Sequence, residues 1–264
     1  MTPVLVFDLE TVPDVAGLRR LYDAGPELTD REVADMAMLH RRQQTGSDFL
    51  PLHLQRVVTL SCVLREGERL RVFSLSEPQA GEAEIIRRFF EGIERYTPQL
   101  VSWNGGGFDL PVLHYRAMLH GVAAPRYWDL GEEDRDFRFN NYISRYHTRH
   151  LDLMDLLALY QPRAYVPLDE FARLLGLPGK LGMDGSQVWA AYLAGRIDDI
   201  RNYCETDVVN TYLVYLRFQR LRGLLDERQY ADEVALVRQT LAASDAAHWR
   251  EFLAAWLAAG AIMS

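Results

Sequence analysis

The spacing of apolar and polar residues predicts most of the secondary structure of this chain. Residues 4–9 are largely apolar and predict a buried strand, with Pro13 as its end. Residues 56–75 predict two strands joined by a turn at Gly67, which together form a β-hairpin. A further short strand is expected at residues 99–104. Apolar residues at helical spacing predict helices at 28–44, 81–96, 110–120 and 198–221, and two alanine-rich helices near 226–258.

This order of elements predicts an α/β fold. Initial strands followed by alternating strands and helices are typical of a mixed central sheet flanked by helices. The edge where the strands end is the expected place for a functional site. In the last predicted helix, Trp249, Phe252 and Trp256 recur at spacings of three and four, which favours a stripe packed on the body of the protein over a partner interface.

The composition is that of an ordinary soluble protein, with 264 residues, 48% of them hydrophobic and 25% charged. No apolar run reaches the roughly 18 residues of a membrane span, and no secretory signal is expected. Cys62 and Cys204 form no CxxC pair, which favours a reduced, cytoplasmic location. The net charge of −8 argues against broad coating of nucleic acid, but it suits an enzyme whose acids surround cations.

Asp8 and Glu10 interrupt the first apolar strand at alternate positions. Residues i and i+2 of a strand point to the same side, so these two carboxylates should face one way. They would repel each other unless a cation lay between them, and hard oxygen ligands suit Mg²⁺ or Mn²⁺. The simpler alternative is a pair of acids that ends the strand and caps the next turn.

Two later segments carry further candidate acids. In "VSWNGGGFDLPVL" a strand leads through three glycines to Asp109, which could be a functional carboxylate or the N-cap of the following helix. In "YCETDVV" Tyr203 and Asp207 are four residues apart and share one helix face. Glu205 is rotated by about 200° from Tyr203 and should point elsewhere. The alternative is a core tyrosine beside an exposed aspartate.

Taken together, F-D-x-E-T, N-x₃-F-D and Y-x₃-D occur in this order, and with the segments "HLDLMDLL", "LGLPGKLGMDGSQVW" and "YCETDVVNTYLVYLRF" they extend over residues 4 to about 218. This combination resembles the tyrosine branch of the DEDD 3′→5′ exonucleases, in particular stand-alone bacterial relatives of the proofreading exonuclease domain of family-B DNA polymerases. The resemblance implies a ribonuclease-H-like domain at residues 1–222. Residues 223–264 are then expected to form a helical extension packed on it.

The resemblance also implies roles for individual residues. Asp8, Glu10, Asp109 and Asp207 would hold two divalent cations, Mg²⁺ or Mn²⁺, and Tyr203 would orient the attacking water. Expected substrate contacts are Leu9 and Thr11 beside the terminal nucleotide, Asn104 and Phe108 at the glycine-rich turn, Lys180 in "PGKLGMDGS", and Arg145 in the arginine- and aromatic-rich segment 135–150. The alternatives for the last two segments are a glycine-rich connector and a solvated loop.

The expected activity is therefore metal-dependent hydrolysis of phosphodiester bonds at the 3′ ends of single-stranded nucleic acid, with DNA favoured over RNA. An exoribonuclease that trims RNA 3′ ends remains an alternative, because recognition of the 2′-hydroxyl depends on the shape of the site. A non-catalytic module that binds nucleic acid or protein on the same fold is a more distant one. The sequence indicates no membrane partner and identifies no protein partner.

Overall fold

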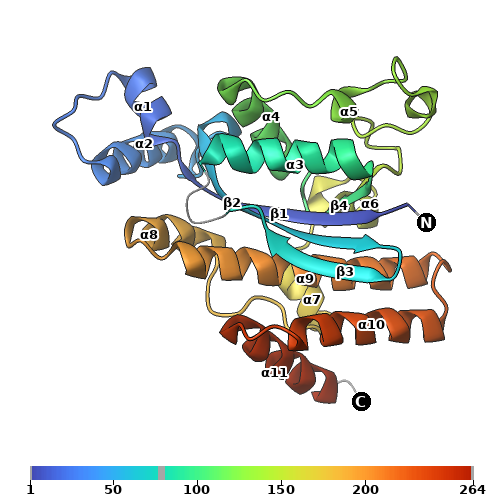
Figure 1. Ribbon diagram of the computed structural model, residues 1–264. Helices are drawn as coiled ribbons and strands as arrows, with labels where there is room; N and C mark the ends of the chain where they lie inside the picture. Colours follow the sequence, from blue (N-terminus) through green and yellow to red (C-terminus); the bar gives the residue numbers. More distant parts are fainter. Residues whose placement is uncertain (1, 77–80, 263–264) are drawn as a thin grey trace.

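The computed structural model describes residues 2–76 and 81–262 (Figure 1). Within these residues the strands form one five-stranded sheet in the order β3-β2-β1-β4-β5. β1 pairs antiparallel with β2 and parallel with β4, so the sheet is mixed. The strands are β1 (Val4–Pro13), β2 (Gln55–Glu66), β3 (Arg69–Ser74), β4 (Gln99–Ser102) and β5 (His150–Asp152).

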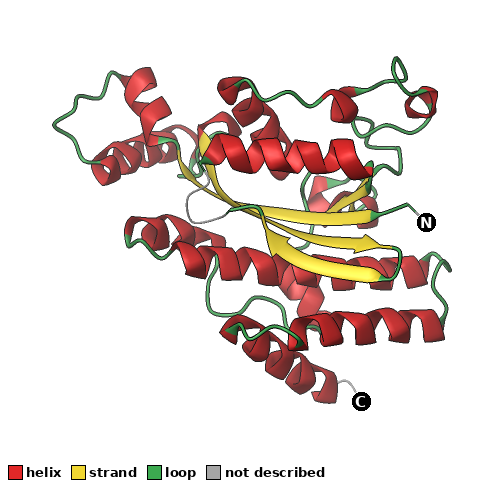
Figure 2. Cartoon of the chain, in the orientation of Figure 1, coloured by secondary structure: helices red, strands yellow, loops and turns green. Residues whose placement is uncertain are grey.

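Helices lie around the strands and make up most of the regular structure, as Figure 2 shows. They are α1 (Val15–Tyr22), α2 (Asp30–Thr45), α3 (Glu82–Tyr96), α4 (Asp109–His120), α5 (Pro125–Trp128), α6 (Leu153–Leu157), α7 (Leu168–Leu174), α8 (Val188–Leu193), α9 (Ile197–Leu221), α10 (Glu227–Ala242) and α11 (Ala247–Ile262). Among the described residues no helix is long and apolar enough to cross a membrane.

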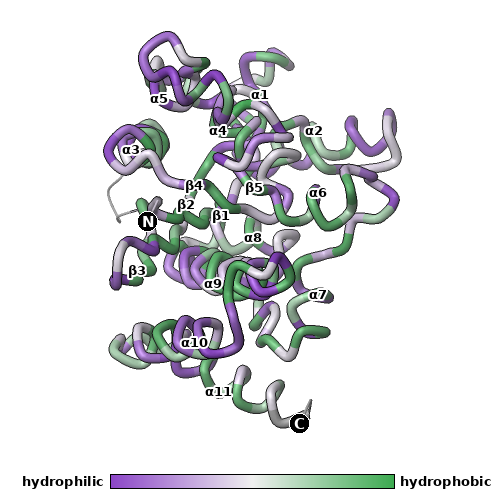
Figure 3. Tube along the Cα trace, turned by 90° about the vertical axis from the view of Figure 1, so that its right-hand side faces the viewer, coloured by the Kyte–Doolittle hydropathy of each residue, from purple (hydrophilic) through white to green (hydrophobic). Residues whose placement is uncertain are grey.

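Helices cover both faces of the sheet (Figures 1 and 3). Phe7 and Leu9 of β1 pack into a core with α3 and α4. Val6, from the opposite face of the same strand, packs into a second core with α9, α10 and α11. Because side chains alternate along a strand, Asp8 and Glu10 belong to the face that α9 covers. This arrangement confirms the predicted α/β class with a ribonuclease-H-like fold.

The predicted strands and helices are largely confirmed, with differences at their ends. β1 ends at Pro13, as predicted, and residues 10–13 continue the apolar stretch 4–9 as one strand because β2 pairs with β1 as far as Pro13 and Gln55. A register shift between Glu10 and Thr11 accommodates the longer pairing. α2 begins after Thr29, whose side chain accepts a hydrogen bond from the backbone of Glu32 in a capping box.

Candidate metal centre

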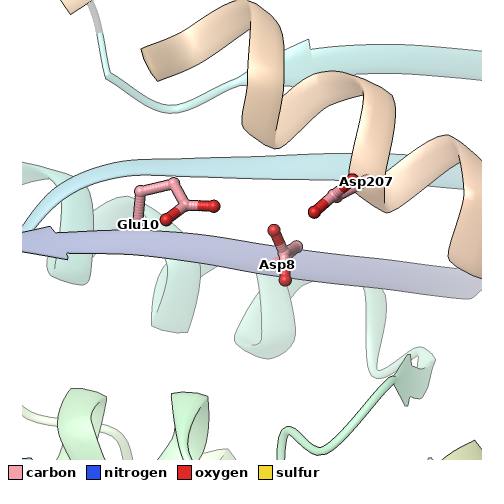
Figure 4. Close-up of side chains that lie close together, drawn as sticks. All are labelled: Asp8, Glu10 and Asp207. Atoms are coloured by element: carbon pink, nitrogen blue, oxygen red, sulfur yellow. The ribbon is translucent and has the colours of Figure 1, made fainter. Parts of the chain in front are cut away.

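Asp8, Glu10 and Asp207 lie together where β1 passes beneath α9 (Figure 4). One carboxylate oxygen from each residue lies within 4.8 Å of the others. The period of the strand brings Asp8 and Glu10 to one side, and α9 supplies Asp207 from the layer that covers this side. The structure thus unites two acids near the start of the chain with a third from one of its last helices.

The electrostatics of this cluster favour a bound cation. Burial raises the pKa of Asp8 well above its ordinary value, and the charges of Asp109 and Glu10 raise it further. Burial likewise raises the pKa of Asp207 to about 6, although the Lys180 ammonium opposes the shift. Asp207 Oδ1 is buried without a hydrogen-bond partner. A buried oxygen of this kind is costly unless it is paired, and hard carboxylate oxygens are the ligands that Mg²⁺ and Mn²⁺ prefer, so the residues fit such ions.

Asp109 approaches this cluster from the opposite layer of the molecule. It is the first residue of α4 rather than its N-cap, which is Phe108. Its Oδ1 accepts a hydrogen bond from the Leu9 backbone N–H at 3.1 Å. This N–H is available because the pairing of β1 with β4 ends at Val6 and Val101. Burial raises the pKa of Asp109 to about 7. Asp109 is thus a neighbour of Asp8 but not a member of the three-acid group.

The glycine-rich turn before α4 is tightly built. Asn104 adopts a left-handed conformation with φ of 66°, and its carbonyl oxygen accepts hydrogen bonds from the N–H groups of Gly107 and Phe108. Asp152, at the end of β5, accepts hydrogen bonds from the N–H groups of Asn104 and Gly106. A Cβ atom at Gly105 would lie 2.4 Å from Ser102 Oγ, so only glycine fits there. This turn fixes where Asp109 enters the site.

Tyr203 and Lys180 complete the side of the cluster formed by α9. Lys180 Nζ donates a hydrogen bond to the Tyr203 hydroxyl at 2.6 Å and lies 3.9 Å from Asp207 Oδ2. Burial raises the pKa of Tyr203 far above its usual range, and the charges of Asp207 and Glu10 add to the effect. Tyr203 therefore stays protonated. Glu205 points away, as its rotation predicts, and contacts Ser74 and His248.

The remaining predicted contacts lie in different places. Thr11, Asn104 and Phe108 line a cavity of about 700 Å³ that also contains Glu10. The Leu9 side chain is buried in the core on the opposite face of the sheet, so only its backbone reaches the site. Arg145 forms a 2.9 Å ion pair with Asp155 and lines a separate cavity of about 510 Å³, which shares Asn104 with the first.

Three residues at the site were not predicted from the sequence. The Cys204 thiol donates a hydrogen bond to the Asp8 carbonyl oxygen at 3.3 Å. Phe49 and Trp189 line the cavity beside Glu10. Trp189 ends the segment "LGLPGKLGMDGSQVW", which contributes to the family resemblance, but it was not singled out as a site residue. Phe49 belongs to no motif, and no local pattern could have identified it.

The motifs and their geometry agree with comparisons to known proteins. A family described as predicted 3′-5′ exonucleases related to the exonuclease domain of PolB matches residues 47–256. This segment contains Asp109, Tyr203 and Asp207, whereas Asp8 and Glu10 precede it.

Individual DNA polymerases resemble part of the chain. The catalytic chain of DNA polymerase epsilon from Emericella nidulans is 28% identical over 145 residues, which cover 53% of this chain and 6% of that polymerase. A DNA polymerase of Archaeoglobus fulgidus is 25% identical over 136 residues, which cover 50% of this chain and 17% of that polymerase. The shared segment is thus a small part of each relative.

Proposed function

Because the chain belongs to the family of predicted 3′-5′ exonucleases related to the exonuclease domain of PolB, we propose that it removes nucleotides from the 3′ ends of single-stranded DNA. The observation that carries this proposal is the convergence of the Asp8, Glu10 and Asp207 carboxylates within 4.8 Å, beside an unpaired buried oxygen of Asp207. Such a cluster is what a hard divalent cation requires of a protein.

We assign the four acids to two neighbouring cation sites. Asp8, Glu10 and Asp207 would hold one divalent cation, and Asp109 would help Asp8 to hold a second, with Mg²⁺ or Mn²⁺ as the ions. When bound, two such ions neutralise the phosphodiester and favour both the attacking and the leaving oxygen. Little covalent help from the protein is needed in phosphoryl transfer, so the fixed positions of the acids are the main contribution of the chain.

Tyr203 is suited to position water rather than to remove its proton. Its raised pKa keeps the hydroxyl protonated, and its oxygen already accepts a hydrogen bond from Lys180. The hydroxyl proton is then shared between the Asp207 carboxylate, with which Tyr203 forms a hydrogen bond, and the oxygen of an attacking water. Lys180, the only lysine in the sequence, brings a positive charge to the place where a phosphate would lie.

The relatives support DNA as the substrate, since they are DNA polymerases. The two alternatives are an exoribonuclease with the same ions and a binding module without catalysis. The convergence of the acids favours catalysis, because a module that only binds nucleic acid would gain nothing from repelling phosphates with clustered carboxylates.

The test is an assay of the full chain on 5′-labelled single-stranded DNA and RNA oligonucleotides of the same sequence. We expect a ladder of products shortened from the 3′ end of DNA in Mg²⁺ or Mn²⁺, and none in EDTA. Asp207→Asn, purified in parallel, controls for contaminating nucleases and should lose activity by orders of magnitude. Faster shortening of RNA would favour the exoribonuclease, and intact oligonucleotides with measurable binding would favour the binding module.

A further inference from the structure

An apolar groove lies between α7 and the C-terminal half of α9, two helices that Figure 3 shows side by side. Its volume is about 360 Å³. Apart from arginines its lining is apolar, and it consists of Leu157, Phe171, Leu175, Val214, Phe218 and Leu221. Leu157 is 39% exposed and Leu221 is 74% exposed. Large aliphatic side chains that meet water in one contiguous groove indicate an interaction surface.

Three arginines surround this groove. Arg217 and Arg220 line it, with their guanidinium carbons 4.9 Å and 5.5 Å from the centroid of the Tyr230 ring. Arg222 lies over the Phe218 ring at 5.4 Å. Among the described residues, no acid forms an ion pair with any of these arginines. Although the chain has a net charge of −8, the groove is therefore a locally positive surface.

The arginines are held in place, but their hydrogen-bonding capacity is not used. Stacking on a ring fixes the plane of a guanidinium group and leaves its N–H edge available to a carboxylate, which can accept two hydrogen bonds at once. Arg217 Nε is buried without a hydrogen-bond partner. A buried donor that lacks an acceptor is costly, so an anionic group bound at this edge would satisfy a donor that the protein leaves unpaired.

The rings beside the groove favour a peptide over a nucleic acid as its occupant. Single-stranded nucleic acids bind by stacking their bases on aromatic rings. The Phe171 ring is already stacked on Trp103, with centroids 5.7 Å apart and an interplanar angle of 24°, and Arg222 faces the Phe218 ring. The exposed apolar surface comes instead from the two leucines, which suit the aliphatic side chains of a peptide.

We propose that this groove binds an acidic segment of a partner protein. Large apolar side chains of the segment enter between α7 and α9, and its carboxylates pair with Arg217, Arg220 and Arg222. Leu221 lies fourteen residues after Asp207, which corresponds to about 21 Å along α9. The partner therefore localises the chain without occupying the three-acid group.

The experiment measures binding of the full chain to a short fluorescein-labelled peptide in which two leucines are flanked by glutamates, by fluorescence anisotropy. One control peptide carries lysines in place of the glutamates, and another carries serines in place of the leucines. A labelled single-stranded DNA oligonucleotide, kept intact by EDTA, represents the nucleic-acid alternative.

Two variants change exposed residues that line the groove, Leu221→Asp and Arg220→Glu. Their matched controls introduce the same side chains at exposed positions that do not line it, Leu39→Asp in α2 and Arg69→Glu in β3. None of the four positions belongs to the candidate metal centre, so all four variants should keep the cleavage activity of the wild-type chain.

We expect only the peptide with both leucines and glutamates to bind the wild-type chain, and more weakly as NaCl is raised. Leu221→Asp and Arg220→Glu should each weaken this binding by about five- to thirty-fold, as is typical of a residue central to an interface. The two control variants should bind the peptide like the wild-type chain. Binding of the DNA oligonucleotide should be the same in Arg220→Glu and the wild-type chain.

Three results would overturn the proposal. The first is that the wild-type chain fails to bind the acidic peptide, or binds a control peptide equally well. The second is weaker DNA binding in Arg220→Glu without any peptide binding, which would assign the arginines to nucleic acid. The third is a dimer in sedimentation that Leu221→Asp abolishes, again without peptide binding, which would assign the groove to a second copy of the chain.

Discussion

Asp109 and Asp207 are carboxyl groups that bind protons more tightly than free aspartates do. Burial raises their pKa to about 7 and about 6, from the ordinary value of 3.8. At these two groups the folded, metal-free chain therefore binds more protons than the unfolded chain between about pH 4 and 7. Within this window the contribution of these groups to stability is lost as the pH rises, and it is regained as the pH falls.

Asp207→Asn provides the first prediction. In EDTA, the free energy of unfolding of the wild-type chain should fall more steeply from pH 5 to pH 8 than that of Asp207→Asn, measured by urea denaturation. Saturating Mn²⁺ should reverse this difference, because the ion competes with protons for the carboxylates and stabilises only the folded state. If the free energy of unfolding depends on pH in the same way for both proteins in EDTA, the pKa of Asp207 is not raised in the folded chain.

Tyr203→Phe separates positioning of water from metal binding. The change removes the hydroxyl that accepts a hydrogen bond from Lys180 and keeps the ring in its buried place. We expect kcat to fall by roughly a hundred- to a thousand-fold, as for the loss of one positioned hydrogen bond in an enzyme site. The Mn²⁺ concentration for half-maximal activity should stay nearly unchanged. Wild-type kcat in the variant would remove the hydroxyl from the mechanism.

Individual residues differ in how well their sequence context predicts them. The period of two places Asp8 and Glu10 on one face, and the helical period places Tyr203 one turn from Asp207. The contact of Lys180 with Tyr203 spans 23 positions, and an irregular segment connects Lys180 to the helices that lead to α9. Such contacts depend on how the chain folds back, and no local pattern encodes them.

At the scale of elements, the separation of β4 from β1 creates the site. The two strands pair only from Val4 to Val6, after which β4 gives way to the glycine-rich turn and Asp109 reaches the Leu9 N–H. Motif spacing predicted this turn. The eight-residue α1 was not predicted, because a helix so short shows hardly more than two periods of its apolar pattern.

Gly105→Ala tests whether the glycine-rich turn positions Asp109, with Gly92→Ala as the matched control. The new Cβ would meet Ser102 Oγ at 2.4 Å and the Phe7 ring at 3.4 Å, so the turn must shift and carry Asp109 with it. We expect kcat/KM to fall at least about a hundred-fold, since a shift of about 1 Å in a catalytic group has this effect. Gly92→Ala, in α3, meets nothing within 4 Å and should stabilise the chain by up to about 1 kcal/mol with unchanged activity. Full activity of Gly105→Ala would mean that the turn does not position Asp109.

At the scale of the whole molecule, the C-terminal helices are part of the central core. Val237 of α10 and Phe252 of α11 pack in the same cluster as Val6 of β1. Arg65 of β2 forms a 2.6 Å ion pair with Glu233 of α10, which fastens the extension directly to the sheet. The spacing of Trp249, Phe252 and Trp256 predicted that this stripe is buried, but it could not identify the surface that covers it. The division at residue 222 into a domain and an extension stays a prediction.

Phe252→Ala tests whether residues 1–222 and the C-terminal extension unfold together or separately. Phe252 is fully buried, so its truncation should cost about 3–5 kcal/mol of unfolding free energy in urea. Leu257→Ala, at a residue that is 65% exposed on the same helix, should change it by less than about 0.5 kcal/mol. Because one apolar cluster joins the extension to the sheet, we expect Phe252→Ala to lower a single transition seen alike by circular dichroism and by loss of nuclease activity. Loss of part of the helical signal at a lower urea concentration, with activity intact until a second transition, would instead establish residues 1–222 as an autonomous domain.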